Sequence, residues 1–258
     1  MERSALIDAL RDHLTADSQV EVAWLGGSDA TGRTDGLSDL DPVVVTRAAD
    51  IEGVFTGIED LLDRTIGIRH RHRFGPPTPH GHEQALYLGE RTPPSLAIDL
   101  VVMDLDTKSR ERFIEPERHG HPIVLVDRAG WFDQPTPLDR AMHQGRIDRY
   151  LAELASLHPH LMPLVEKAIV RGDWLDAFTW YQNRCVKPLC DLMRIEHDPD
   201  RFDYGFRYLD RDLPDAEREL LQRLAFIGSP EDLPAAFAEA RREIERRLAV
   251  LSPQSHRG

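Results

Sequence analysis

The hydrophobic pattern of the chain changes its period at the proline-marked segment of residues 134–137, and no other feature constrains the fold as strongly. Before this segment, short apolar runs alternate with stretches rich in glycine, serine and proline, as strands and turns do. After it, apolar residues recur about every 3.6 positions over long stretches, which is typical of amphipathic helices. The pattern therefore predicts two domains, residues 1–133 built around a β-sheet and residues 134–258 built from helices.

The first domain is predicted to contain several strands and two helices. Strands are expected over residues 20–25, 43–45, 66–74, 84–88, 96–103 and 123–126, and helices over residues 4–14 and 51–62. In the second domain, helices are expected over residues 138–157, 161–170, 174–195, 215–226 and 233–251. The predicted fold class is α+β: a mixed β-sheet flanked by helices, followed by an all-helical C-terminal domain.

Charge and composition narrow the classes of partner. The sum of 32 Lys and Arg against 45 Asp and Glu gives a formal net charge of −13. A nucleic-acid partner is therefore not expected, because such binding depends on lysine and arginine. The sequence has neither a signal peptide nor an apolar run long enough for a membrane span, and its two cysteines have no zinc-motif spacing. We expect a cytoplasmic protein without a membrane partner; the oligomeric state is not readable.

A turn rich in small residues ends the first predicted strand. Gly26, Gly27 and Ser28 follow this strand directly. Glycines at a strand end let the backbone approach a polyphosphate closely, and a serine hydroxyl can bind its oxygens. Gly-Gly-Ser is also a common turn, so alone it indicates little.

Three aspartates complete the pattern. Asp39 and Asp41 are two residues apart at the start of an apolar strand, so their side chains point to the same side and can bind hard divalent cations. Asp99 lies inside a later apolar strand, where an ionised carboxylate is costly unless a cation offsets it. Each aspartate alone has an ordinary explanation, but their order and spacing after a phosphate-binding turn predict a two-metal phosphoryl- or nucleotidyl-transfer site.

Residues 25–28, 38–41 and 98–100 together resemble the signature of the DNA-polymerase-beta-like nucleotidyltransferase superfamily. The two halves of the chain are similar to its small-molecule branch, the aminoglycoside and lincosamide antibiotic nucleotidyltransferases, in which a helical domain follows the catalytic sheet. The motif covers residues 24–101, and the helical half matches in architecture only. Pro42 departs from the pattern, because an aliphatic residue is usual there and proline has no N–H to donate to a sheet.

The resemblance implies a reaction and its cofactors. A nucleoside triphosphate, with ATP as the favoured one, would bind with two Mg²⁺ ions, and AMP would pass to a hydroxyl of a small molecule such as an aminoglycoside or lincosamide. Gly27 and Ser28 would contact the phosphates, and Asp39 and Asp41 would hold the metals. Asp99 would complete the metal site or act nearer the acceptor. The acidic net charge is compatible with a cationic acceptor.

Further residues are candidates for supporting roles. Glu83, on the strand before that of Asp99, is the candidate general base, and a surface glutamate at a strand end is an equally good interpretation. Tyr181, Arg184 and Lys187 recur every three residues, so that Arg184 or Lys187 could reach the triphosphate. The same spacing fits a salt-bridge strip on a helix surface.

Histidine pairs suggest a metal site only weakly. The pairs comprise His70 and His72, His80 and His82, and His119 and His121. None has the spacing of a known zinc motif, so histidines at the surface or in a substrate groove are the favoured interpretation.

Other classes of function are less consistent with the sequence. The main alternative is a non-catalytic relative of the same fold, which would bind a nucleotide or a partner as a sensor or antitoxin. Retention of Asp39, Asp41 and Asp99 argues against it, because a binding module has no need of a costly aspartate in an apolar strand. A nucleic-acid-directed transferase is disfavoured by the charge of −13.

Overall fold

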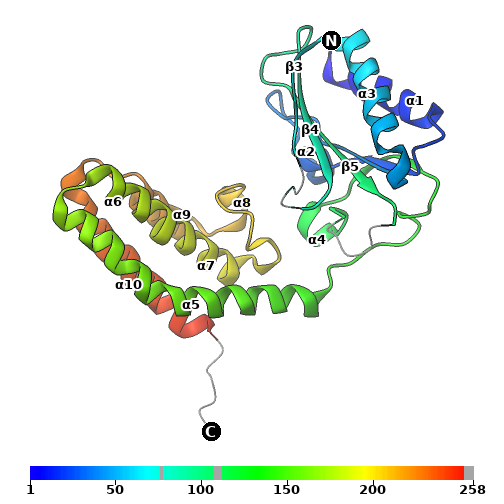
Figure 1. Ribbon diagram of the computed structural model, residues 1–258. Helices are drawn as coiled ribbons and strands as arrows, with labels where there is room; N and C mark the ends of the chain where they lie inside the picture. Colours follow the sequence, from blue (N-terminus) through cyan, green and yellow to red (C-terminus); the bar gives the residue numbers. More distant parts are fainter. Residues whose placement is uncertain (76–77, 79, 107–111, 253–258) are drawn as a thin grey trace. The chain divides into compact units, whose positions relative to one another are not determined.

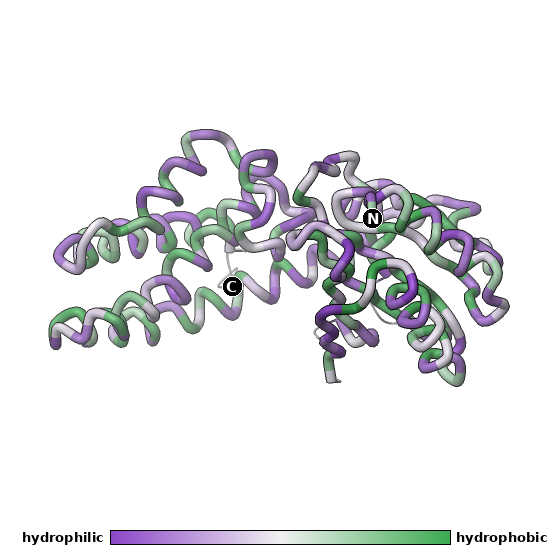
Figure 2. Tube along the Cα trace, turned by 90° about the horizontal axis from the view of Figure 1, so that it is seen from above, coloured by the Kyte–Doolittle hydropathy of each residue, from purple (hydrophilic) through white to green (hydrophobic). Residues whose placement is uncertain are grey.

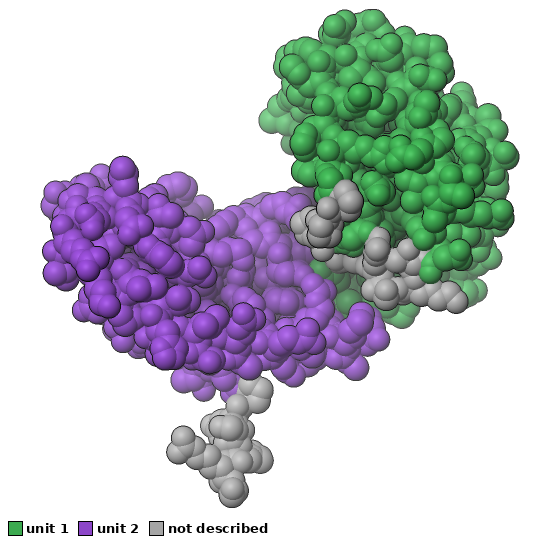
Figure 3. All heavy atoms as spheres, viewed as in Figure 1, with its two compact units in different colours: residues 1–138 green, residues 139–258 purple. Residues whose placement is uncertain are grey.

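The computed structural model describes residues 1–75, 78, 80–106 and 112–252. The chain divides into two compact units, Met1–Leu138 and Asp139–Gly258, which Figure 3 colours separately. This division lies five residues after the boundary at residue 133 expected from the hydrophobic pattern. Each unit has its own core.

Unit 1 is built on a six-stranded mixed sheet, as far as the described residues show. In the order β3-β4-β5-β2-β1-β6, only β2 and β5 are parallel neighbours. The fold is α+β, as predicted, and each predicted strand is present. The strands span Val22–Leu25 (β1), Pro42–Thr46 (β2), Ile68–Arg73 (β3), Glu83–Gly89 (β4), Ala97–Asp104 (β5) and Ile123–Asp127 (β6).

Two helices cover one face of this sheet (Figure 1). Helix α1 (Arg3–Ala16) and helix α3 (Ile51–Ile66) bury their apolar residues against β1, β2, β4 and β5. Pro42 begins β2, a position where the missing N–H of proline is tolerated. The opposite face has a smaller apolar cluster around Trp24, packed against Trp131 and Phe132.

Unit 1 also contains two short helices in the connections between its strands. Helix α2 (Gly27–Thr31) begins within the glycine turn that follows β1, and α4 (Pro116–His119) precedes β6. Gly32 ends α2 in the left-handed conformation, with a φ of 67°. The motif glycines therefore form a strand-to-helix turn.

The described elements of unit 2 are helices. The main ones are α5 (Arg140–Arg171), α6 (Trp174–Tyr181), α7 (Lys187–His197), α9 (Asp215–Ala225) and α10 (Leu233–Leu251); the π-helical turn Gln182–Val186 joins α6 to α7. Short helical turns are formed by Pro199–Arg201, α8 (Leu209–Asp212) and Pro230–Asp232. The hydropathy colouring changes along these helices, as expected of amphipathic segments (Figure 2).

One predicted helix boundary is wrong. The pattern placed a break between residues 157 and 161, but α5 continues for 32 residues through Pro159 and Pro163. A proline removes one hydrogen bond of the helix ladder. Buried residues before and after Pro159, including Leu151, Met162 and Val165, pack into the same core and hold the helix together.

None of the described helices is long and apolar enough to cross a membrane.

Candidate active site

A parallel β-bridge brings the three aspartates onto one face of the sheet. Leu40 pairs with Ile98; its N–H donates to the carbonyl before Ile98 (2.9 Å), and its carbonyl accepts from Asp99 N–H (2.8 Å). Leu40 and Ile98 are both fully buried in the core beneath α1 and α3. Since neighbouring side chains of an extended segment point to opposite faces, Asp39, Asp41 and Asp99 share the other face.

The electrostatics of Asp41 reflect this grouping. Burial raises the pKa of Asp41, and the negative charges of Asp99, Asp39 and Asp29 add to this effect while Arg3 opposes it; the resulting pKa is about 6. Three carboxylates thus act on a fourth in a partly desolvated place. A divalent cation would relieve this repulsion.

The glycine turn lies directly against Asp41. Gly26 N–H donates to the carbonyl of Asp41 at 2.9 Å. Gly27 has a φ of +55°, and a Cβ there would lie 2.7 Å from Asp41 Cγ, so only glycine fits. Ser28 Oγ is buried and has no hydrogen-bond partner among the described residues. A buried hydroxyl without a partner fits a site that takes a polar ligand.

Asp39 is held by the backbone of β5 and by an arginine. Its Oδ1 accepts from Ala97 N–H at 3.1 Å, and its carbonyl accepts from Arg3 at 2.9 Å. Arg3 also forms an ion pair with Asp29 of α2. Sequence analysis missed Arg3, whose position in the first turn of α1 carries no motif.

Asp39, Asp41 and Asp99 share one face of the sheet, but their carboxylate oxygens are not close enough together to form a three-ligand group. Within the described residues, only Glu196, His197 and Glu217 of unit 2 place three ligand atoms within 4.8 Å of one another. A cation held by the aspartates would draw their oxygens closer. The ligand atoms that the three aspartates offer are carboxylate oxygens, which suit Mg²⁺ better than zinc.

The Glu196–His197–Glu217 group already has a cation of its own. Arg247, whose side chain is 1% exposed, forms ion pairs with Glu196 and with Glu217. A metal would have to compete with this buried guanidinium, so the group is better explained as a structural ion-pair cluster. The predicted histidine pairs form no such three-ligand group in the part of the chain that the structure describes.

Glu83 does not lie on the same face of the sheet as the three aspartates. It pairs in register with Val102, which is buried beneath α1 and α3, so Glu83 lies on the opposite face of the sheet from Asp99. Its carboxylate accepts from Arg73 at 3.3 Å, and Arg73 also pairs with Glu52 of α3. The position of Glu83 therefore does not support a general base on the face that carries the aspartates.

The neighbour of Glu83 faces the aspartates instead. Gln84 Nε2 donates to Asp99 Oδ1 at 2.7 Å. Burial raises the pKa of Asp99, the hydrogen bond from Gln84 opposes this effect, and the negative charge of Asp39 adds to it. Only the strand register distinguishes Gln84 from Glu83, so sequence analysis did not single it out.

Arg184 and Lys187, the residues of unit 2 predicted to contact the triphosphate, lie in different environments. Lys187 Nζ contacts both oxygens of the buried Asp191, at 2.7 and 2.5 Å. Arg184 is exposed and lies 5.4 Å from the ring centroid of Trp180. Tyr181 is fully buried, so the three residues do not form the single face that their spacing suggested. The π-helical turn Gln182–Val186 shifts the helical period between them.

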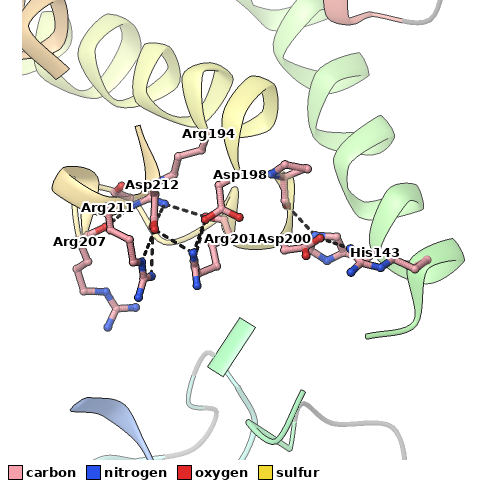
Figure 4. Close-up of polar contacts among 11 residues, drawn as sticks. His143, Arg194, Asp198, Asp200, Arg201, Arg207, Arg211 and Asp212 are labelled. Atoms are coloured by element: carbon pink, nitrogen blue, oxygen red, sulfur yellow. Dashed lines mark hydrogen bonds and ion pairs between the residues drawn. The ribbon is translucent and has the colours of Figure 1, made fainter. Parts of the chain in front are cut away.

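A second polar network organises the loop after α7 (Figure 4). Asp212, whose side chain is fully buried, accepts from Arg194 at 2.8 Å and from Arg201 at 2.9 Å, and Arg211 also pairs with it. Arg194 also donates to the carbonyls of Gly205, Arg201 and Arg207. Most of its donors therefore bind backbone, which indicates a structural role.

No protein-family model matches the chain, and no curated protein sequence matches it either.

The raised pKa of Asp41 predicts a pH dependence of stability in metal-free protein. The unfolded pKa is about 3.9 and the folded pKa is about 6, so the folded state binds more protons between these values. Its contribution is greatest below pH ~4 and is lost as the pH rises through ~6. In EDTA, we expect the unfolding free energy of the wild type to fall by about 2 kcal/mol relative to Asp41→Asn between pH 4 and 7. Hydrogen exchange at the amides of β1 and β2 measures this difference, and a pH-independent difference would contradict it.

Proposed function

We propose that the protein is a metal-dependent nucleotidyltransferase that moves a nucleoside monophosphate to a hydroxyl of a small molecule. The observation that carries the proposal is the Leu40–Ile98 bridge, which sets Asp39, Asp41 and Asp99 on one sheet face. The turn at Gly27 and Ser28 lies beside the same carboxylates. This combination supports the resemblance to the DNA-polymerase-beta-like nucleotidyltransferase superfamily.

The roles follow from the chemistry of the groups. Asp39, Asp41 and Asp99 would hold Mg²⁺, which supplies charge neutralisation for the triphosphate and its leaving group. Ser28 Oγ, buried without a partner, would bind a phosphate oxygen. The acceptor oxygen would attack the α-phosphorus while the bond to the pyrophosphate oxygen breaks. The hydroxyl proton would pass to a carboxylate, and Asp99 replaces Glu83 as the candidate on this face.

The proposed substrate classes follow from the family resemblance and from the net charge of the chain. ATP is the proposed nucleotide because of the family resemblance. The net charge of −13 is compatible with a cationic acceptor such as an aminoglycoside, and a lincosamide is the other candidate.

The test combines turnover with nucleotide binding. The full chain would be incubated with Mg²⁺, each nucleoside triphosphate and a panel of aminoglycosides and lincosamides. We expect pyrophosphate release and an acceptor product heavier by one nucleoside monophosphate. Calorimetry should show that EDTA removes most of the ATP affinity, because the metals link the carboxylates to the phosphates. Equal ATP affinity in EDTA and in Mg²⁺ would contradict the metal site.

The main alternative, a non-catalytic nucleotide-binding module, predicts a different combination of results. Such a module would bind ATP with Mg²⁺ dependence but release no pyrophosphate with any acceptor. The pair of measurements therefore separates the two functions.

A further inference from the structure

Asp99 is the end of a chain of side-chain hydrogen bonds that runs from the loop before β4 into the sheet. Gln84 Nε2 donates to Asp99 Oδ1 at 2.7 Å. Gln84 Oε1 lies 3.2 Å from His80 Nε2. One amide therefore contacts a carboxylate with its nitrogen and an imidazole with its oxygen.

The loop backbone determines which nitrogen of His80 carries the proton. His82 N–H donates to His80 Nδ1 at 3.1 Å, so Nδ1 must be an acceptor. In the neutral ring the proton is then on Nε2, which donates to Gln84 Oε1. This arrangement assigns the amide of Gln84 as well, because its oxygen faces a donor and its nitrogen faces an acceptor.

Packing holds the His80 ring in place. The ring stacks on His82 with a centroid distance of 5.5 Å, and the ring of Phe113 meets it edge-on, also at 5.5 Å. Thr78, which is 8% exposed, donates to the carbonyl of His82 at 2.6 Å, and its Oγ1 lies 3.4 Å from His80 Nδ1. The donor that faces Gln84 is therefore held by three neighbouring residues.

We propose that Gln84 and His80 are positioning residues that hold Asp99 in its metal-binding orientation. The inference rests on the proposed function, since it assigns a purpose to Asp99. With Oδ1 occupied by Gln84, Asp99 has Oδ2 left for a cation beside Asp41. Partners that orient a ligating carboxylate typically contribute about 10–100-fold to metal affinity or activity.

The test measures metal binding directly, without nucleotide or acceptor. Mn²⁺ would be titrated calorimetrically into the full chain and into Gln84→Met, which keeps the side-chain length but removes both hydrogen bonds. We expect Gln84→Met to bind Mn²⁺ about 10-fold more weakly. His80→Leu should weaken binding in the same direction, and His80→Gln, which keeps an N–H donor, should recover most of the affinity.

Two matched variants control for the substitutions themselves. Gln19→Met removes a Gln–Asp hydrogen bond of 3.1 Å at an exposed site, between Gln19 and Asp50. His72→Gln repeats the histidine substitution on β3, where the ring contacts only Phe74 among the described aromatic residues. Both should bind Mn²⁺ as the wild type does. Thermal unfolding in EDTA shows whether each variant is folded.

The outcomes separate the positioning role from the function on which it rests. A purely structural role for Gln84 would lower thermal stability in EDTA and leave Mn²⁺ affinity unchanged, and this result would overturn the inference alone. Equal losses in His80→Leu and His80→Gln would overturn the part assigned to His80. Absence of Mn²⁺ binding by the folded wild type would overturn the proposed metal site, and the inference with it.

Discussion

Replacing Asp41 with asparagine is expected to lower the rate of nucleotidyl transfer by at least ~10²-fold while the protein remains folded. Asp41 lies against Gly27 and shares a sheet face with Asp39 and Asp99, so its carboxylate belongs to the proposed metal site. Asparagine keeps the shape but removes the charge that balances the cation. Pyrophosphate release at saturating ATP and Mg²⁺ measures the effect.

The same substitution should stabilise the metal-free protein at pH 7. Burial and the neighbouring carboxylates raise the pKa of Asp41, so the ionised side chain is destabilising there and its neutral isostere is not. Asp60→Asn, on the exposed side of α3, is the matched control because it changes the net charge equally. Loss of activity in both variants, or in neither, would argue against a specific role for Asp41.

Replacing Asp212 with asparagine should cost unit 2 about 3–5 kcal/mol of stability. Burial alone would raise the pKa of Asp212, but hydrogen bonds from Arg211 and Arg194 hold it below its usual value, so the carboxylate is ionised. Its removal leaves the guanidinium of Arg194, which is fully buried, without a counter-charge. Hydrogen exchange at the amides of α7 in the intact chain reports the loss for unit 2 by itself.

Two further variants test whether the loss comes from the uncompensated charge of Arg194. Asp215→Asn removes an ion pair with Arg218 in which the aspartate is 81% exposed, so its effect on stability should be small. The double variant Arg194→Met with Asp212→Leu removes both charges and should recover much of the stability, although the loop carbonyls lose a donor. A loss in Asp212→Asn no larger than that in Asp215→Asn would show that the network is dispensable.

Local pattern predicted most of the elements but not all of their ends. The apolar runs that became β1, β2 and β5 are short and surrounded by turn residues, which left little ambiguity. The pattern predicted separate helices over residues 138–157 and 161–170, but the buried residues of α5 on both sides of Pro159 join one core. Tertiary packing outweighs the hydrogen bonds lost at Pro159 and Pro163, and no local signal reports that packing.

The sequence predicts those features of the candidate site that depend on the spacing of residues along the chain. It does not predict the features that depend on the register between strands. Asp39 and Asp41 share a face because they are two residues apart on an extended segment. Glu83 and Gln84 are neighbours, and their sequence context does not say which of them faces Asp99. The pairing of Glu83 with Val102 places Gln84 on the face of Asp99. A register shift of one residue would place Glu83 on that face instead.

The sequence by itself determined the division into a sheet-containing half and a helical half, because hydrophobic period is a local property that each segment carries with it. It also determined the residue types of the site, three aspartates and a glycine turn. Only the tertiary structure decided that Asp99 lies beside Asp41, since the Leu40–Ile98 bridge joins segments far apart in the chain. The hydrogen-bond partners of Asp99 were decided in the same way, because strand register depends on the burial of a whole sheet face.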